Sequence, residues 1–350
     1  MKNIVFTGGG TAGHIMPNLA IINDIKDEYN IFYFGSNGME KKIISQYKFI
    51  QFVEIPSVKF LRNLSPQNLL IPLKMLKNIK IAKQKLIQIS PVLIFSKGGY
   101  VSIPTCLAGQ QLKIPTITHE SDLTIGLANK IIAKKSKKIC CSFKTTADKF
   151  KKNAIFTGSP IRREIFNGKK DIILNRHHIE NQTPIILIVG GSQGAKAINE
   201  FIWNNIDNLT KTYHIIHIVG KNNINDSIKQ HNYTQIEFAQ DIENYFQASD
   251  IVISRAGSNT IFELLAIEKP MILIPLPKSK YSRGDQVLNA EYFKNEGLAE
   301  ILYQEKLEIN EFKNVIDKIL KNKPQIISKM KKANNYVGNK NIIEIIKNYT

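Results

Sequence analysis

The chain has 350 residues, with 48 Lys and Arg against 29 Asp and Glu, and 43% of its residues are hydrophobic. This length allows two domains, each with its own apolar core. The apolar fraction excludes intrinsic disorder, and 20 Gly and 13 Pro exclude a collagen-like repeat. The three Cys form no C-x-x-C pair, so we expect reduced thiols in a cytosolic protein. No run reaches about 18 apolar residues, so no segment is expected to span a membrane.

Short apolar runs alternate with longer amphipathic segments, which predicts an α/β protein whose parallel sheets are covered by helices on both faces. In chain order, strands are predicted at 3–7, 31–35, 92–96, 115–118, 138–142, 154–157, 184–189, 214–219, 235–238, 250–254 and 271–275. The polar stretch 158–183 separates two sets of strands and is expected to connect two domains. We place these domains at 1–157, joined by a C-terminal helix at 338–350, and at 158–337.

The two halves repeat one plan. A strand runs into Gly8–Gly13 (GGGTAG) in the first half and into Gly190–Ala195 (GGSQGA) in the second. Later in each half a strand ends in a turn of small residues, within IFSKGGY at 94–100 and ISRAGS at 253–258. Ligands bind at such turns in doubly wound sheets. We therefore predict two Rossmann-like domains with parallel sheets, facing each other across one cleft.

The first glycine-rich turn matches G-x-G-x-x-G, in which a phosphate can approach backbone amides at a helix N-terminus. An NAD site also needs an acid at the end of the second strand, but that strand ends in GSN and the nearest acid, Glu40, comes later. The chain has no G-x-x-x-x-G-K-[ST] and hence no triphosphatase P-loop. Two phosphate-type turns favour a ligand with a central diphosphate. A tight turn without a ligand and an NAD site are the alternatives.

Residues Ser254–Glu263 are predicted as strand, turn and helix. Thr260 and Glu263 fit the T-x-x-E capping box, which would make Glu263 a structural cap. In the functional alternative, the turn amides and Arg255 hold hydroxyls or phosphate and Glu263 accepts from a ribose diol.

Candidates for proton transfer in the first half are His14, His119 with Glu120, and Tyr100. For each of these residues, the alternative interpretation is a purely structural role. His119 and Glu120 do not begin an H-E-x-x-H zinc motif, because position 123 is Leu. The chain also has no D-x-D motif of paired carboxylates, so no metal site is expected.

The positive charge is concentrated in 59–157, which holds eighteen basic residues against three acidic ones. Within it, segment 60–90 is predicted as a helix with leucines and isoleucines among Lys74, Lys77, Lys80, Lys83 and Lys85. This pattern fits a core-packed helix with a solvated basic face, or a surface that binds anionic lipid headgroups. Nucleic acid is a third possibility, but the lysines have no interleaved aromatic residues and only one Arg beside them.

Seven motifs, in this order and spacing, resemble the MurG family of N-acetylglucosaminyltransferases, which convert lipid I to lipid II in bacterial peptidoglycan synthesis. They are GGGTAGHIMPNLAI, KGGYVSIP, HESDLTIGLANK, TGSPIR, GGSQGAKAIN, SRAGSNTIFE and RGDQVLNA. The resemblance implies a GT-B fold without a cofactor or metal. It also implies that the second domain binds UDP-GlcNAc and that the first binds lipid I and docks peripherally on the anionic cytoplasmic face of the cell membrane, with no nucleic-acid partner.

The resemblance also implies site residues. Arg162 and Ser192 would hold the donor diphosphate, Glu263 the uridine ribose, the backbone at Ala239 the uracil, and Gln286 sugar hydroxyls. The remaining contacts it implies are Thr11, Ala12, Gly13, Asp122, Arg255, Ser258, Asn259 and Thr260 with the donor, and Gly98, Gly99 and Tyr100 with the acceptor. Positions 119–122 read HESD where the family often has HEQN, so Asp122 replaces an amide with a carboxylate.

The chemistry that follows is attack of the acceptor 4-hydroxyl on C1 of the donor sugar, with inversion and loss of UDP. A helix N-terminus and Arg162 would stabilise the leaving diphosphate in place of a metal. We predict His14 as the general base, with His119 and Glu120 as the next candidates. The alternatives are a UDP-sugar 2-epimerase, a glycosyltransferase acting on a diacylglycerol or a soluble acceptor, an NAD-dependent oxidoreductase and a basic nucleic-acid-binding protein.

Overall fold

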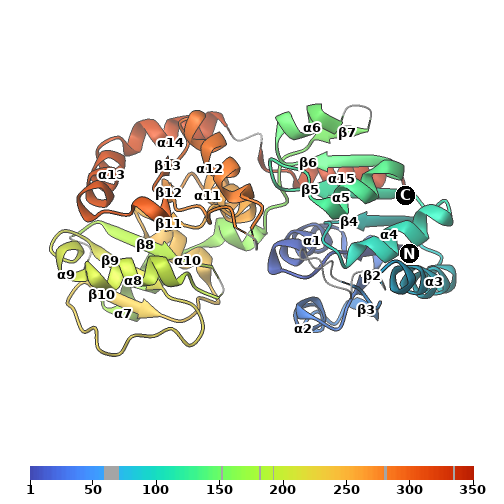
Figure 1. Cartoon of the computed structure of the whole chain (residues 1–350), viewed down its shortest axis with the longest axis horizontal. Coiled ribbons are helices and arrows are strands. Elements are labelled where there is room, and N and C mark those ends of the chain that lie inside the picture. The colour runs from blue at the N-terminus through green and yellow to red at the C-terminus, as the bar shows by residue number, and fades with distance from the viewer. Residues whose placement is uncertain (59–70, 151–152, 181–182, 192, 280–281, 334–335) are drawn as a thin grey trace. The chain divides into compact units, whose positions relative to one another are not determined.

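Two units with parallel sheets make up the chain: Met1–Arg162 with Asn335–Thr350, and Arg163–Asn334 (Figure 1). The computed structural model describes residues 1–58, 71–150, 153–180, 183–191, 193–279, 282–333 and 336–350.

Among the described residues, the sheet of the first unit has seven parallel strands in the order β3-β2-β1-β4-β5-β6-β7. The strands are β1 (Lys2–Thr7), β2 (Tyr29–Gly35), β3 (Ile50–Glu54), β4 (Leu93–Ser96), β5 (Thr116–Glu120), β6 (Lys138–Cys141) and β7 (Ala154–Phe156). The helices are α1 (Ala12–Ile25), α2 (Met39–Ile44), α3 (Ile71–Ile89), α4 (Ser102–Gln111), α5 (Leu127–Ile132), η2 (Ala133–Lys135), α6 (Lys144–Phe150) and α15 (Asn339–Lys347).

Both faces of this sheet are buried, which explains why its strands are apolar without alternation. Ile4 and Phe6 of β1 belong to one apolar cluster together with residues of α1 and α15. Val5, which points to the opposite face, belongs to a second cluster with residues of α3, α4 and α5. Helices therefore cover both sides of the central strand.

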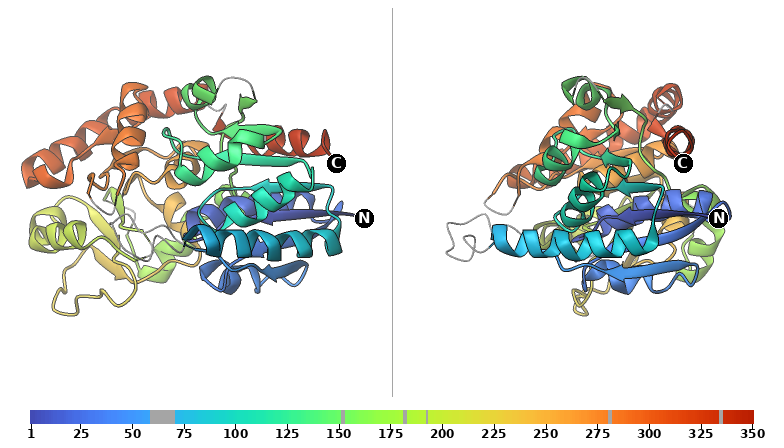
Figure 2. Two further views of the ribbon diagram at one scale, coloured as in Figure 1. Left: turned by 45° about the vertical axis from the view of Figure 1, so that its right-hand side comes forward. Right: turned by 90° about the vertical axis from the view of Figure 1, so that its right-hand side faces the viewer.

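The C-terminal helix α15 is part of the first unit. Ile342 and Ile346 are fully buried in the cluster that contains α1. The last residue, Thr350, contacts Tyr29 through hydroxyls 2.8 Å apart and accepts a hydrogen bond from Lys2 Nζ. The two ends of the chain accordingly lie close together (Figure 2).

The described residues of the second unit form six parallel strands in the order β10-β9-β8-β11-β12-β13. They are β8 (Ile185–Val189), β9 (His214–Ile218), β10 (Tyr233–Ile236), β11 (Ile251–Ser254), β12 (Met271–Leu273) and β13 (Glu300–Ile301). The helices are η3 (Arg163–Asn167), α7 (Lys170–His177), α8 (Lys196–Asn204), α9 (Ile206–Leu209), α10 (Ile242–Ala248), α11 (Ser258–Ala266), α12 (Asp285–Asn295), η4 (Gln304–Lys306), α13 (Ile309–Lys321) and α14 (Lys323–Lys332).

Every predicted strand region contains a strand, whereas β3 and β13 were not predicted. Both lie at sheet edges, where β3 is only partly buried and β13 has two residues. The predicted connection at 158–183 contains the boundary between the two units, at Arg162 and Arg163, and it also contains α7, which packs on α10. Arg176 Nη2 of α7 lies 2.7 Å from Oδ2 of Asp241, the residue before α10. Of the predicted helix at 60–90, residues 60–70 lie outside the described part, and α3 begins at Ile71.

The capping-box interpretation of Thr260 is wrong. Helix α11 begins at Ser258 with Gly257 as its N-cap and has no side-chain capping hydrogen bond. Thr260 is the third helical residue, and Glu263 follows almost one turn later, beyond the reach of a cap.

Candidate functional site

In the first unit, predicted site residues gather at the carboxyl ends of three neighbouring strands. β1 leads into Gly8–Gly13, β4 into Lys97–Tyr100, and β5 into Ser121 and Asp122. The connections run in opposite directions on the two sides of the β1 and β4 pair, which makes this edge a topological switch point. Open α/β sheets bind ligands at such a point.

His14 is half-buried between the two glycine-rich turns. Its Nδ1 lies 3.0 Å from the carbonyl oxygen of Gly9 and 3.1 Å from Thr11 Oγ1. Because a carbonyl oxygen can only accept, Nδ1 carries a proton, and in the neutral imidazole Nε2 is then the nitrogen with the lone pair. A Cβ on Gly99, whose φ is +80°, would lie 2.6 Å from the Gly9 carbonyl oxygen and 3.1 Å from His14 Nδ1, so glycine is needed there for the turns to pack together.

Sequence reasoning missed the role of Glu40 in this first turn. Its buried carboxylate accepts hydrogen bonds from the Gly10 amide at 3.2 Å and from the amide of Ser36 at 2.9 Å. A Cβ on Gly9 would lie 2.7 Å from Glu40 Cδ. The Glu40 carboxylate therefore binds the Gly10 amide, which the G-x-G-x-x-G pattern predicts to be available to a phosphate. The sequence signal for this role is that Gly35 and Gly38 closely precede Glu40. Both glycines lie against its side chain.

His119 has both ring nitrogens engaged inside the unit. Its Nδ1 lies 2.9 Å from the ammonium of Lys97, and its Nε2 lies 3.1 Å from the carbonyl oxygen of Gly158. Both side chains are buried, and Lys97 Nζ also donates to Ser121 Oγ. Burial lowers the pKa of Lys97 to about 8, and burial together with the neighbouring ammonium holds the pKa of His119 well below its usual range.

The Glu120 carboxylate also forms its hydrogen bonds with residues inside the first unit. Its carboxylate accepts from the Gly126 amide at 2.9 Å, from Asn129 Nδ2 at 2.9 Å and from the Asp122 amide at 3.2 Å. Burial and the nearby Asp122 carboxylate raise the pKa of Glu120. The buried Asn129, which sequence reasoning left without a role, also donates to the His119 carbonyl oxygen. Glu120 thus fixes the loop that carries Asp122.

The second unit places its predicted residues at the equivalent edge. The turn Gly190–Ala195 follows β8, which neighbours β11 at this sheet's own switch point. Gly194 packs against the loop after β9, where a Cβ would lie 2.0 Å from the Val219 carbonyl oxygen. Ser192 lies outside the described residues.

Arg255 and Gln286 support loops within this unit. The Nη1 atom of Arg255 donates to the carbonyl oxygen of Ile274 at 3.1 Å, and its Nη2 donates to Gln304 Oε1 at 2.5 Å. Gln286 Oε1 accepts from the Leu276 amide at 2.9 Å. Burial lowers the pKa of Arg255 from its ordinary value. Both side chains thereby hold the segment that follows β12.

The other predicted residues lie on the same elements. Ser258, Asn259 and Thr260 form the first turn of α11, and Glu263 is half-buried in the next turn. Ala239 lies in the loop after β10, beside Phe238, whose side chain is 60% exposed. In the first unit, Thr11, Ala12 and Gly13 begin α1, Gly98, Gly99 and Tyr100 follow β4, and the half-buried Arg162 ends the segment after β7.

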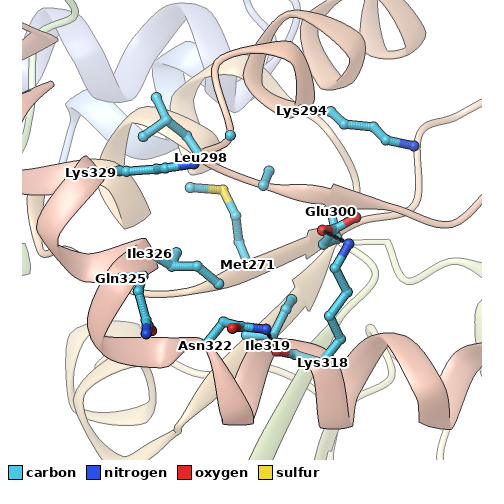
Figure 3. A pocket seen from close by; sticks show the side chains of 12 residues that line it. Met271, Lys294, Leu298, Glu300, Lys318, Ile319, Asn322, Gln325, Ile326 and Lys329 are labelled. Carbon is cyan, nitrogen blue, oxygen red and sulfur yellow. Dashed lines mark hydrogen bonds and ion pairs between the residues drawn. The ribbon is translucent and has the colours of Figure 1, made fainter.

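A cavity of about 310 Å³ lies elsewhere in the second unit (Figure 3). Met271 and Glu300, which begin β12 and β13, place it at the amino ends of these strands. Lys318 closes one side, with its Nζ 2.6 Å from Glu300 Oε1. No predicted site residue lines this cavity.

The described ranges contain no group of three or more His, Cys, Asp or Glu side chains that could hold a metal ion. Nor do they contain a helix that is long and apolar enough to cross a membrane.

The surface of α3 combines apolar and basic side chains. Ile79, Ala82 and Leu86 are buried in the core, whereas Leu73 is 66% exposed and Leu76 63% exposed. Exposed lysines at 74, 77, 80 and 85 lie on the same helix. Part of the apolar surface is therefore open to solvent beside positive charge.

Comparisons with known proteins cover the whole chain. Residues 4–141 match the glycosyltransferase family 28 N-terminal domain, and residues 185–346 match the C-terminal domain of that family. A Clostridium botulinum (strain Langeland) protein is 42% identical over 100% of both chains, and one from Clostridium tetani is 40% identical over 99% of this chain and 98% of the relative. Both are named UDP-N-acetylglucosamine--N-acetylmuramyl-(pentapeptide) pyrophosphoryl-undecaprenol N-acetylglucosamine transferase.

Solved structures share the fold. The crystal structure of Acinetobacter baumannii MurG superposes with a TM-score of 0.77 at 24% identity, covering 99% of this chain and 100% of that one. UDP-GlcNAc 2-epimerase from Neisseria meningitidis superposes with a TM-score of 0.69 at 14% identity, with the same coverage. The matches confirm the predicted GT-B fold class of two Rossmann-like domains and the predicted resemblance.

Proposed function

Because this chain belongs to glycosyltransferase family 28, together with relatives named as N-acetylglucosamine transferases, we infer that it transfers N-acetylglucosamine from UDP-GlcNAc to undecaprenyl-pyrophosphoryl-N-acetylmuramoyl pentapeptide. The observation that carries this conclusion is the 42% identity over the full length of both chains. We assign the acceptor to the first unit and the donor to the second.

We propose His14 as the general base. The half-buried imidazole has its Nδ1 proton directed at the Gly9 carbonyl oxygen, which leaves the lone pair on Nε2. Nε2 takes the proton of the acceptor 4-hydroxyl as its oxygen bonds to C1 of the sugar, the bond from C1 to the diphosphate breaks, and UDP leaves with inversion at C1. The Gly9 carbonyl stabilises the imidazolium that forms. His119 and Glu120 fit this role less well, because internal hydrogen bonds occupy them.

The donor is held by the carboxyl edge of the second unit in this proposal. Amides of Gly190–Ala195, the N-terminus of α11 and the Arg162 guanidinium stabilise the leaving diphosphate without a metal. Glu263 accepts from the ribose hydroxyls. The backbone at Ala239 pairs with the uracil, and the exposed ring of Phe238 offers it an apolar face.

The roles of the remaining donor residues rest on the motifs. Ser192, Gln286 and Asp122 stay predicted donor contacts. For Arg255, the hydrogen bonds to Ile274 and Gln304 favour a supporting role behind the phosphate turn.

Peripheral attachment to the cytoplasmic face of the membrane is part of the same proposal. Its support is the exposed Leu73 and Leu76 beside exposed lysines on α3. Apolar side chains that enter the interface and lysines that meet anionic headgroups reinforce each other. A lipid-linked acceptor requires the enzyme to work at this surface.

Ligand-dependent unfolding tests the donor assignment. UDP-GlcNAc should raise the unfolding midpoint, whereas NADH and an oligonucleotide should leave it unchanged, because only a ligand of the native state stabilises it. Stabilisation by NADH alone would favour an oxidoreductase instead. The 2-epimerase alternative is tested by incubating UDP-GlcNAc without acceptor, and formation of UDP-N-acetylmannosamine would contradict the transferase assignment.

A further inference from the structure

A chain of hydrogen bonds connects the carboxyl ends of β4, β5 and β7 in the first unit. It runs from Ser121 Oγ to Lys97 Nζ, on to His119 Nδ1, and from His119 Nε2 to the Gly158 carbonyl oxygen. Lys97 follows β4, His119 lies in β5, and Gly158 follows β7. Lys97 is 2% exposed and His119 is 0% exposed, so water does not compete for these contacts.

We propose that Lys97 is a positioning residue for the glycosyl transfer, acting through His119 on the segment Gly158–Arg162 and through Ser121 on the turn that carries Asp122. This inference rests on the proposed function, in which Arg162 and Asp122 contact the donor. Nothing in the motif resemblance assigned a role to Lys97.

The direction of each hydrogen bond follows from the donor inventory. An ammonium can only donate, so His119 Nδ1 must be the acceptor. The Gly158 carbonyl can only accept, so Nε2 must carry the proton. Lys97 and Gly158 thereby select the same neutral tautomer of His119, and the ammonium keeps Nδ1 unprotonated while Nε2 holds Gly158.

The segment from Gly158 to Arg162 is well placed to transmit this constraint. Gly158 has a left-handed φ of +82°, which glycine adopts without a steric penalty. After it, the Ser159 amide donates to the Tyr336 carbonyl oxygen at 2.7 Å, and the Ile161 amide donates to Asn339 Oδ1 at 2.7 Å. The backbone is thus tied on both sides up to the residue before Arg162.

Stability alone does not explain a buried lysine here. Its contact partners are a neutral imidazole and a hydroxyl, while the charges of Glu120 and Asp122 favour the ammonium from farther away. Burying an ammonium is costly, and replacing buried charged groups with apolar ones of similar shape is often neutral or stabilising. The buried ammonium is therefore better explained by the positions in which it holds His119 and Ser121.

The first experiment reads the His119 tautomer by imidazole ¹⁵N NMR, with His119→Gln to assign the signals. The wild-type protein should show only the Nε2-protonated neutral form from about pH 6 to 7, where Lys97 is still an ammonium. In Lys97→Met, Gly158 still accepts from Nε2, so His119 should keep its tautomer when neutral, but its pKa should rise and its Nδ1 resonance should shift because the ammonium is lost. The exposed Lys137→Met should match wild type. A mixed or charged His119 in wild type, or an unchanged His119 in Lys97→Met, would overturn the proposal. This readout does not depend on activity, so its failure is distinguishable from failure of the proposed function.

The second experiment compares kinetics with stability. A small displacement of reacting groups costs up to about a hundredfold in rate, so Lys97→Met should lose about tenfold to a hundredfold in kcat/KM for UDP-GlcNAc, with an unfolding midpoint close to that of wild type. Lys97→Gln keeps a donor for His119 Nδ1 and should recover most of the loss. Equal activity in all three proteins, or losses that only follow the unfolding midpoint, would contradict the proposal. Should Lys97→Met fail to fold, Lys97→Gln decides alone: one fixed tautomer with activity near wild type supports the proposal, and mixed tautomers with full activity overturn it.

Discussion

The Nδ1 atom of His14 lies 3.0 Å from the carbonyl oxygen of Gly9, so the backbone of the first glycine-rich turn orients the ring that follows it. This contact fixes the tautomer and leaves the lone pair on Nε2. Gly99 lets the second glycine-rich turn approach the same imidazole. We propose His14 as the base because internal hydrogen bonds occupy both His119 and Glu120.

Replacing His14 with Ala should lower kcat by about 10² to 10⁴-fold, the usual contribution of a general base. KM for UDP-GlcNAc should change little, because the donor binds the second unit. Steady-state kinetics at saturating acceptor measure both constants. His14→Gln, which retains a donor for the Gly9 carbonyl, should be as slow as His14→Ala, and an unchanged kcat in either variant would remove His14 from the role.

Glu40→Gln should destabilise the first unit by about 1 to 3 kcal/mol, because an amide nitrogen replaces one carboxylate oxygen and cannot accept, so either the Gly10 or the Ser36 amide loses its acceptor. Urea unfolding followed by tyrosine fluorescence measures the change. Glu54→Gln is the matched control, since Glu54 pairs with Lys41 at the surface and should cost little. Equal effects of the two substitutions would show that the turn does not depend on Glu40.

Replacing Lys74, Lys77 and Lys80 by Glu should weaken binding to vesicles that contain anionic lipid, because attraction becomes repulsion at the surface of α3. Replacing Leu73 and Leu76 by Ser should weaken it through loss of apolar insertion. Co-sedimentation with vesicles measures both effects.

The control for this experiment changes the net charge equally elsewhere. Lys221, Lys229 and Lys321 are exposed on the second unit, and their replacement by Glu should leave vesicle binding nearly intact. Equal loss in both triple variants would mean that binding follows total charge and not α3.

Because His217 is buried in the folded state, we expect the protein to lose stability in acid. Burial lowers its pKa to about 3, and its ring contacts Asn199 Oδ1 at 3.1 Å and the Tyr233 hydroxyl at 3.0 Å. The unfolded state therefore binds a proton on this residue below about pH 6.5, whereas the folded state binds it only below about pH 3. The free energy of unfolding falls as pH falls through this window. From pH 7 to 5 the loss should be about 2 kcal/mol from this group.

Urea unfolding of His217→Gln at both pH values isolates that contribution. The variant should be less stable at pH 7 and should lose less stability on acidification than wild type. His231→Gln, at an exposed position, should keep the wild-type pH dependence. An identical pH dependence in His217→Gln would contradict the assigned burial effect.

The sequence predicts the buried strands well, because β1 places Ile4 and Phe6 on one covered face and Val5 on the other. Edge strands such as β3 and β13 escape prediction, since partial burial and short length leave little pattern. The site is predictable where a turn has a fixed composition, as at Gly8–Gly13. The motifs do not predict which polar side chains form hydrogen bonds with each other, because these partners are distant in sequence and come together only when the chain folds.

Lys97 and Glu40 illustrate that limit. Each lies next to a glycine-rich element, but their partners His119 and Gly10 are far away in sequence. His119 looked like a base because it closes a strand at the ligand edge, and its neighbours from β4 and β7 turn it inward. The same edge position thus produces different roles for His14 and His119.

Transfer of labelled N-acetylglucosamine from UDP-GlcNAc to a lipid I analogue, with EDTA present, tests the central claim most directly. We predict a β-linked product and UDP in equal amounts from the wild-type protein, and at least a hundredfold slower formation of both from His14→Ala. Absence of product, or product only when a divalent metal is supplied, would contradict the account.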